Sequence, residues 1–198
     1  MDSAITQDQL AVFRNAINSL QPIPDEDFNL LAGVLHYKKY SKGEVLSKEG
    51  QVSKNFWFVL KGCLRIYSVD DNHEVNVSFF FENTLAGDFI SLRHQIPSEF
   101  FIEAMEETET LVSYRQDYFP VLNFSTSLIQ LTGLFFLQKY FGELQHSNSF
   151  KLMNPEERYN YLLKNHPKYI QRIPITHLAS YLGVSRKTLT RIRSNALQ

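Results

Sequence analysis

The chain has 198 residues, of which 43% are hydrophobic, enough for one medium-sized domain with a core or for two small ones. The single cysteine, Cys63, excludes an internal disulfide, a cysteine-ligated iron–sulfur cluster and a cysteine-based zinc site. The net charge of −1 conceals an uneven distribution, because residues 151–198 hold nine Lys or Arg against two Glu, while residues 1–150 hold eleven against nineteen acidic residues. A basic C-terminal segment on an acidic body is typical of a module that binds a polyanion.

The N-terminal segment lacks a basic region followed by an apolar run, and no uninterrupted apolar stretch is long enough to cross a bilayer. With one cysteine, this pattern favours a soluble protein in a reducing, cytoplasmic setting that makes no membrane contact.

Two short helices are expected first. The helix over residues 7–20 has one apolar face, formed by Leu10, Phe13, Ile17 and Leu20. Pro22 and Pro24 end it, and a second helix begins at about Asp25, the predicted N-cap. The buried side of this second helix consists of Phe28, Leu31 and Leu35.

Between residues 37 and 115 the pattern becomes that of β-strands. Seven short runs are rich in β-branched or aromatic residues: VLHYKKY, EVLSKEG, NFWFVLKG, CLRIYSVD, EVNVSFFF, FFIEAM and ETLVSYR. Strands this short and this closely spaced predict an antiparallel roll or barrel. Three glycines stand at junctions that favour positive φ: Gly43, Gly50 and Gly62. The aromatic side chains expected in the core are Trp57, Phe58, Phe79 and Phe81.

Beyond Asp117 the helical period returns, and Ser125 is placed to cap a long helix that reaches about His146. Its first apolar stripe consists of Phe124, Leu128, Leu131 and Phe135, and its second of Leu134, Leu137, Phe141 and Leu144. A helix that is apolar on two sides needs two partners. We expect the roll to cover one stripe and the same helix of a second subunit to cover the other, which predicts a homodimer through residues 124–146. A wholly intramolecular core is the alternative.

The C-terminal part is predicted to be helical. Asn154 and Pro155 begin a helix that runs to Lys164, and residues 165–174 then lead into ITHLASYLGVSRKTLTRIR, residues 175–193. In that stretch Gly183 ends one helix and Ser185 caps the next. The residues expected to pack the two helices together are Leu178, Ala179, Leu182, Leu189 and Ile192. This spacing predicts a helix-turn-helix.

The outer face of the second helix carries Arg186, Lys187, Thr190 and Arg191. Such a cationic, hydrogen-bonding surface near a helix N-terminus favours double-stranded DNA as a partner. A structural helical hairpin with a solvated basic face is the alternative, and the charge distribution between the two parts of the chain favours DNA.

The order of these parts resembles the cyclic-AMP receptor/FNR (Crp/Fnr) family of bacterial transcription regulators. The stretches that carry the resemblance are KGEVLSKEG, FWFVLKGCLRIY and ASYLGVSRKTLTRIR, and it extends over the chain after about residue 25. It implies an α+β fold in three parts: N-terminal helices and a β-roll (jelly roll) sensor domain over 1–116, a dimerisation helix region over 117–150, and a helix-turn-helix domain over 151–198. It also implies a homodimer that reads a palindromic DNA site through the helix 185–195, with RNA polymerase as a further partner.

By this resemblance, the DNA-binding residues are Ser185, Arg186, Lys187, Thr188, Thr190 and Arg191. Arg186, Lys187 and Arg191 would face base edges, while Ser185 and Thr188 would lie near phosphates. Lys187 departs from the acidic residue that the family often has at this position.

The resemblance also places the cyclic-nucleotide cassette at LAGDFISLRHQIPSEFF, residues 85–101. The family uses a Gly-Glu pair and then an Arg followed by Ser or Thr. Gly87 and Asp88 match the pair with a shorter carboxylate, but Ser98 or Glu99 stands where the Arg is expected. A carboxylate beside a phosphate would repel it, so we predict that the roll does not bind cyclic AMP, although Arg93 could supply a cation from another direction.

Other functions have weaker support. A cupin-like enzyme would need clustered histidines, but the six histidines are scattered, and the sequence has no Gly-rich phosphate loop, HExxH motif or nucleophile elbow. We therefore expect neither an enzyme nor a metal site. The alternative function is a β-roll signalling protein that responds to a cyclic nucleotide or another small molecule without sequence-specific DNA binding.

Overall fold

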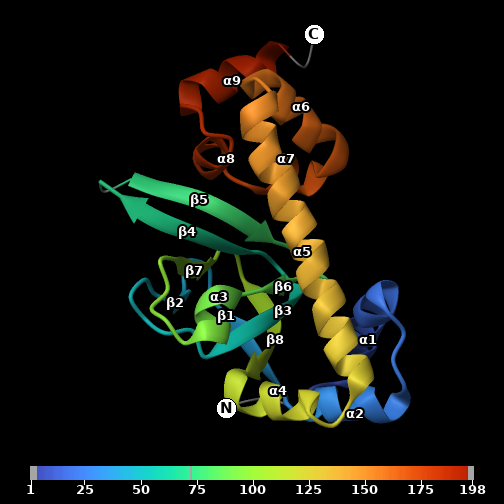
Figure 1. Cartoon of the computed structure of the whole chain (residues 1–198). Helices are drawn as coiled ribbons and strands as arrows, with labels where there is room; N and C mark the ends of the chain where they lie inside the picture. Colours follow the sequence, from blue (N-terminus) through green and yellow to red (C-terminus); the bar gives the residue numbers. More distant parts are fainter. Residues whose placement is uncertain (1–3, 72, 196–198) are drawn as a thin grey trace. The chain divides into compact units, whose positions relative to one another are not determined.

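The computed structural model describes residues 4–71 and 73–195 (Figure 1). The chain divides into two compact units. The first comprises Met1–Ile66 and Phe79–Leu137, and the second comprises Tyr67–Ser78 and Gln138–Gln198. One β-hairpin and one long helix therefore contribute residues to both units.

Two helices open the first unit. Helix α1 (Gln7–Leu20) begins with a capping box, in which the Gln9 amide donates to Thr6 Oγ1 at 3.3 Å and the Thr6 amide donates to Gln9 Oε1 at 2.9 Å. Helix α2 (Asp25–Ala32) follows. The prediction of Asp25 as its N-cap is wrong by one residue, because Pro24 occupies the cap position and Asp25 opens the helix. The Asp25 carboxylate forms an ion pair with Arg14 instead.

Eight strands in the described residues form two four-stranded sheets of the roll. Their bounds are β1 (Leu35–Tyr40), β2 (Val45–Ser47), β3 (Asn55–Lys61), β4 (Leu64–Asp70), β5 (His73–Phe80), β6 (Leu85–Ala86), β7 (Phe101–Ala104) and β8 (Thr108–Tyr114). The strand orders are β1-β8-β3-β6 and β2-β7-β4-β5. In the first sheet β8 pairs antiparallel with both β1 and β3, so that Leu111 stands opposite Tyr37 on one side and Phe58 on the other. All seven predicted runs contain a strand, and only the two-residue β6 was not predicted.

The tight turn before β4 requires glycine. Gly62 has φ +98°, and a Cβ added there would lie 2.5 Å from Thr108 Oγ1 and 2.7 Å from the Glu107 carbonyl oxygen. Gly43 and Gly50 also have positive φ, as predicted.

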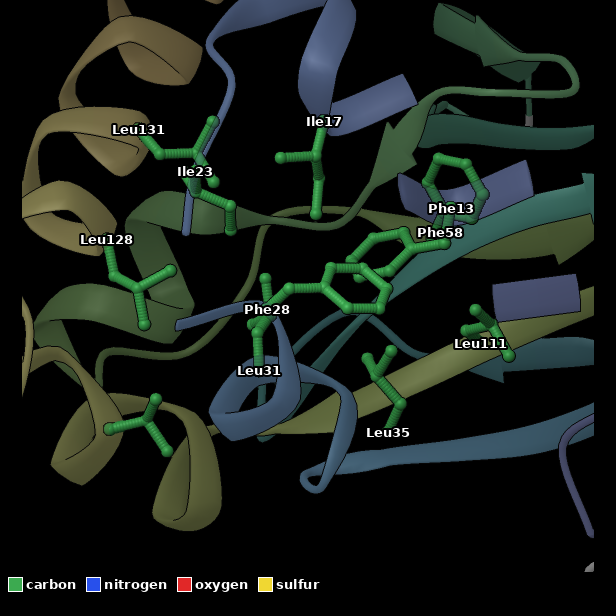
Figure 2. Packing of buried hydrophobic residues seen from close by; sticks show 11 residues of the cluster. Phe13, Ile17, Ile23, Phe28, Leu31, Leu35, Phe58, Leu111, Leu128 and Leu131 are labelled. Carbon is green, nitrogen blue, oxygen red and sulfur yellow. The ribbon is translucent and has the colours of Figure 1, made fainter. Parts of the chain in front are cut away.

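The core of the first unit consists of aliphatic side chains around three phenylalanine rings (Figure 2). Phe13 of α1 contacts Phe58 of β3 edge to face, with ring centroids 4.9 Å apart. Leu128 and Leu131 of the long helix complete this cluster. The four aromatic residues predicted for the core are all buried: Trp57, Phe58, Phe79 and Phe81.

Two helices follow the roll, α4 (Arg115–Leu122) and α5 (Thr126–Leu152). As predicted, Ser125 caps α5, because the Leu128 amide donates to Ser125 Oγ at 3.2 Å. The helix runs six residues beyond the predicted end at His146, and there Ser149 is buried with its hydroxyl donating to the His146 carbonyl at 2.7 Å.

The first predicted stripe of α5 is only partly buried. Leu128 and Leu131 lie in the core, whereas Phe124 precedes the helix and is 76% exposed, so the prediction for Phe124 is wrong. The second stripe is exposed along its length: Leu134, Leu137, Phe141 and Leu144. Among the described residues no single helix is long and apolar enough to span a membrane; α4 and α5 meet that criterion only as a pair, which is bent by 119°.

The second unit continues with α6 (Pro155–Asn165), α7 (Pro167–Arg172), α8 (Ile175–Tyr181) and α9 (Arg186–Asn195). Asn154 caps α6 as predicted, with its Oδ1 accepting from the amides of Glu156 and Glu157. Helix α7 lies in the segment predicted as a connection, and the short α3 (Phe89–His94) of the first unit lies in the segment assigned to the cyclic-nucleotide cassette. Each has only six residues, too few for a clear helical period.

Candidate nucleic-acid interface

Helices α8 and α9 are joined by a tight turn that only glycine accommodates easily. Gly183 has φ +66°, its amide donates to the Ser180 carbonyl at 3.0 Å, and the Val184 amide donates to the Ala179 carbonyl at 2.9 Å. The side chains of Leu178 and Leu189 are fully buried behind the turn. The sequence prediction of two closely packed helices is confirmed in this detail.

Ser185 caps α9, because its Oγ accepts from the Thr188 amide at 3.1 Å and lies 2.9 Å from Thr188 Oγ1. The first turn of α9 contains no acidic residue. The partial positive charge of the helix N-terminus is therefore not offset within that turn.

The four residues predicted for the outer face of α9 are all exposed: Arg186, Lys187, Thr190 and Arg191. They occupy two neighbouring pairs of positions one turn apart, so they share one face, while Leu189 and Ile192 are buried on the other. The Thr190 hydroxyl donates to the Arg186 carbonyl at 2.9 Å, and it keeps its oxygen lone pairs as acceptors. This face presents three cations and a hydroxyl to solvent.

The end of α5 packs against the turn between α8 and α9. An added Cβ on Gly183 would lie 2.8 Å from Phe150 Cε1, and the Phe150 ring is covered by the Arg158 guanidinium at 4.6 Å. His146, one turn earlier on α5, stacks on Tyr181 of α8 with ring centroids 4.6 Å apart. These contacts were not predicted, although Phe150 is a large aromatic residue in a mainly polar segment.

This packing shifts two pKa values. Burial lowers the pKa of His146, and the charge of Arg158 acts in the same direction, while Glu143 opposes it. Burial also raises the pKa of Tyr181, so its phenol stays neutral at physiological pH. His146 Nε2 is buried without a hydrogen-bond partner among the described residues, which favours the uncharged ring there.

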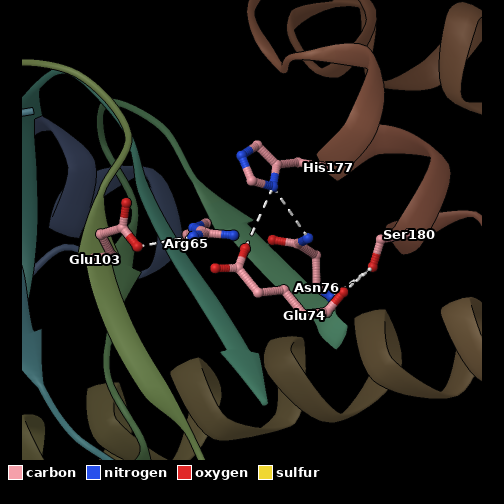
Figure 3. A network of polar contacts seen from close by, with 6 residues as sticks. All are labelled: Arg65, Glu74, Asn76, Glu103, His177 and Ser180. Carbon is pink, nitrogen blue, oxygen red and sulfur yellow. Dashed lines mark hydrogen bonds and ion pairs between the residues drawn. The ribbon is translucent and has the colours of Figure 1, made fainter. Parts of the chain in front are cut away.

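The outer part of the β4–β5 hairpin belongs to the same unit and contacts α8 (Figure 3). The Asn76 amide donates to Ser180 Oγ at 3.0 Å, and Ser180 Oγ donates to the Glu74 carbonyl at 2.9 Å. His177 Nδ1 lies 3.4 Å from Asn76 Nδ2 and 3.8 Å from Glu74 Oε2. No local pattern indicates this network, because it joins polar residues about a hundred positions apart.

The residues predicted for the cyclic-nucleotide cassette are mostly engaged in the fold of the first unit. Asp88 is buried and caps α3, with Oδ1 accepting from the Ile90 amide at 3.1 Å and the Ser91 amide at 3.0 Å. Gly87 packs against Phe56, since an added Cβ would lie 3.1 Å from Phe56 Cβ. Close packing against Phe56 and the capping of α3 thus account for the Gly87–Asp88 pair.

The other three cassette residues differ in exposure. Ser98 is buried, and its Oγ accepts from the Phe100 amide at 3.1 Å. Arg93 and Glu99 are exposed, and the Arg93 guanidinium lies 5.7 Å from the centroid of the Phe119 ring.

A buried cation of the roll was missed by sequence analysis. Arg65 of β4 is paired with Glu103 of β7 at 2.7 Å, with side-chain exposures of 4% and 17% (Figure 3). The two strands are neighbours in the sheet. The presence of a charged residue inside the apolar run CLRIY could have indicated this buried ion pair.

Comparisons with known proteins agree with this architecture. The family of cyclic nucleotide-binding domains matches residues 37–123. The catabolite activator protein of Thermus thermophilus is similar in structure, with 19% identity, a TM-score of 0.57, and coverage of 91% of this chain and 85% of that chain.

Two further solved structures are similar. The c-di-GMP responsive global regulator CLP of Xanthomonas campestris has 15% identity and a TM-score of 0.67, with 88% of this chain and 92% of that chain covered. FixK2 of Bradyrhizobium japonicum has 18% identity and a TM-score of 0.66, with 82% and 84% covered. No curated protein matches the sequence.

Proposed function

We propose that this chain, whose residues 37–123 match the cyclic nucleotide-binding domain family, is a transcription regulator of the Crp/Fnr type that binds double-stranded DNA as a homodimer. The observation that carries the proposal is the exposed cationic face of α9, which begins directly after a capped helix N-terminus. The fold shared with three bacterial regulators over more than four-fifths of the chain supports it. Regulation, and not catalysis, is the role that this family and fold favour, and such a role fits a cytoplasmic location.

In the proposed complex, α9 enters the major groove. Arg186 or Arg191 would donate two hydrogen bonds to a guanine O6 and N7, which contributes about 1 to 3 kcal/mol of discrimination. Lys187 would contact a neighbouring base or phosphate, while Ser185, Thr188 and Thr190 would lie near the backbone. Two recognition helices in a symmetric dimer would read half-sites about 34 Å apart, one turn of the double helix.

The proposed dimer uses the exposed stripe of α5. The side chains of Leu137, Phe141 and Leu144 are exposed to solvent. Monomeric soluble proteins rarely expose large contiguous apolar surfaces of this kind. An open groove of about 370 Å³ continues this surface toward α6, and its lining includes Leu152 and Tyr161. A second copy of the same helix would remove this surface from water. Contact with RNA polymerase is a further part of the proposal and rests on the family resemblance alone.

We also propose that the roll does not bind cyclic AMP. Oδ1 of Asp88 is used to cap α3, and the charge of Arg65 is neutralised by Glu103, so Arg65 is not available to a phosphate without breaking an internal ion pair. Calorimetry with cyclic AMP and cyclic GMP tests this, and micromolar binding of either would contradict it.

The principal experiment measures DNA binding as a function of salt. The association constant of the full chain for a genomic fragment that it selects should fall steeply between 50 and 200 mM salt, because each neutralised phosphate adds about 0.9 to the logarithmic slope. Arg191→Ala should weaken binding by about 1 to 3 kcal/mol and relax the sequence preference if Arg191 reads a base, or lower the slope by about one if it contacts a phosphate.

Lys42→Ala is the matched control. Lys42 is an exposed cation in the turn before β2, and its removal should leave both the affinity and the slope unchanged. A flat salt response of the wild type, or equal affinities of the wild type and an Arg186→Ala/Arg191→Ala variant, would reject DNA binding and favour the alternative of a β-roll signalling protein.

A further inference from the structure

The outer part of the β4–β5 hairpin, residues 67–78, is chemically opposite to the rest of its unit. It contains three carboxylates, Asp70, Asp71 and Glu74, and neither Lys nor Arg. All three residues are exposed. Residues 151–198, by contrast, carry a charge balance of +7. The second unit therefore combines a basic helical part with an acidic hairpin.

The hairpin is held on α8 by specific bonds. The Ser180 hydroxyl accepts from the Asn76 amide and donates to the Glu74 carbonyl, so one side chain ties two backbone groups of β5 to the helix (Figure 3). Asn76 is only 4% exposed although it is polar, and its side chain reaches His177, one turn before Ser180. Buried polar groups that find partners in this way mark a defined contact between elements.

The bonds bring negative charge close to the helix pair. The Glu74 carboxylate lies 3.8 Å from His177, which is well inside the screening length of about 8 Å at physiological salt. A carboxylate at this distance lowers the positive potential that attracts phosphates. It also forms an ion pair with His177 whenever that imidazole is protonated.

We propose that residues 67–78 form an acidic clamp that docks on α8 through Ser180, Asn76 and His177 and lowers the affinity of the helix pair α8–α9 for DNA. The inference rests on the proposed function. The hairpin is formed by β4 and β5, which are also strands of the roll. A change in the position of the hairpin would therefore change the affinity of the helix pair for DNA. The competing role is a hairpin that supports α8 for DNA binding. In that case releasing the hairpin would weaken the affinity for DNA and not strengthen it.

Ser180→Ala in the full chain tests the clamp directly, with a 30-base-pair duplex of arbitrary sequence as the probe. The variant loses both backbone bonds that hold the hairpin on α8, and because the undocked hairpin no longer opposes DNA, it should bind tighter than the wild type by at least about three- to tenfold. Hydrogen exchange of the Asn76 amide should accelerate in the same variant. Ser19→Ala is the matched control, since the Ser19 hydroxyl donates within α1 and makes no hairpin contact.

Charge is tested separately by Asp70→Asn/Asp71→Asn, which leaves every bond to α8 in place and does not depend on how well Ser180→Ala folds. It should also bind DNA more tightly, and the gain should shrink as salt rises. Glu26→Gln removes one exposed charge from α2 and should have no effect.

The outcomes separate this inference from the proposed function. Weaker or unchanged binding by both hairpin variants, in a protein whose wild type binds DNA through Arg191, would overturn the clamp and leave DNA binding intact. Absence of DNA binding by the wild type and all variants would overturn the proposed function itself.

Discussion

Gly183→Ala is the substitution for which the structure gives the clearest magnitude. The backbone there has φ +66°, which costs a residue with a Cβ about 1 to 2 kcal/mol. The new methyl would also lie 2.8 Å from Phe150 Cε1, so this ring, which contacts Arg158 and His146 but is 41% exposed, would have to shift. Overpacking costs about 1 to 3 kcal/mol, and the partial exposure of the ring places the cost near the lower end. We therefore expect the free energy of unfolding of the second unit to fall by about 2 to 3 kcal/mol.

Urea unfolding followed by circular dichroism measures this loss. Gly43→Ala is the matched control, because Gly43 has φ +81° with no atom within 4 Å of the added Cβ, so only the backbone cost of about 1 to 2 kcal/mol applies. Combining Gly183→Ala with Phe150→Ala should recover about 1 kcal/mol or more relative to the sum of the single changes. A Gly183→Ala variant no less stable than Gly43→Ala, or strict additivity with Phe150→Ala, would refute the reasoning.

Three further predictions concern α5 and the second unit. Because the pKa of His146 is lowered in the folded protein, the unfolded chain binds a proton at this imidazole more readily. The contribution of His146 to the free energy of unfolding should therefore be complete above about pH 6.5 and decline as pH falls below it. Thermal melts of the wild type and His146→Phe between about pH 5 and 8 should show this decline only in the wild type. If the chain forms the proposed dimer, Phe141→Glu should convert it to a monomer in sedimentation experiments, whereas Lys151→Glu, also on α5, should not; a dimer that survives Phe141→Glu would exclude this stripe as the interface. Asn154→Ala should lower the stability of the second unit by about 1 kcal/mol in urea unfolding, because it removes the cap of α6, and an unchanged midpoint would contradict that role.

The regular elements could be predicted because their signals are local. Phe13 and Ile17 recur at helical spacing in α1, and the β3 run NFWFVLK is dense in aromatic and apolar residues. Each element can therefore be predicted from a short stretch of sequence. The exposed face of α9 was also predictable, since a cap at Ser185 and buried Leu189 fix where Arg186 and Arg191 point.

The contacts that position α8 and α9 could not be predicted in this way. Phe150 contacts Gly183, and Ser180 contacts Asn76, which is 104 positions away in the sequence. A local periodicity cannot indicate contacts between residues so far apart. The end of α5 was missed for a related reason: Ser149 is polar but buried by its packing, and sequence pattern assigns such a residue to a junction.

Asp88 and Arg65 are charged residues of the roll that already have internal partners. Oδ1 of Asp88 accepts from two amides of α3, which leaves Oδ2 for a further hydrogen bond. Arg65 would have to leave Glu103 to meet a phosphate, and separating a buried ion pair costs about 3 to 5 kcal/mol. The phosphate of a nucleotide would therefore meet this cost before it formed any bond to Arg65. In the function proposed here, control of DNA binding is better placed at the β4–β5 hairpin, because two hydrogen bonds to Ser180, one partly buried and one exposed, can form and break at a smaller cost than a buried ion pair.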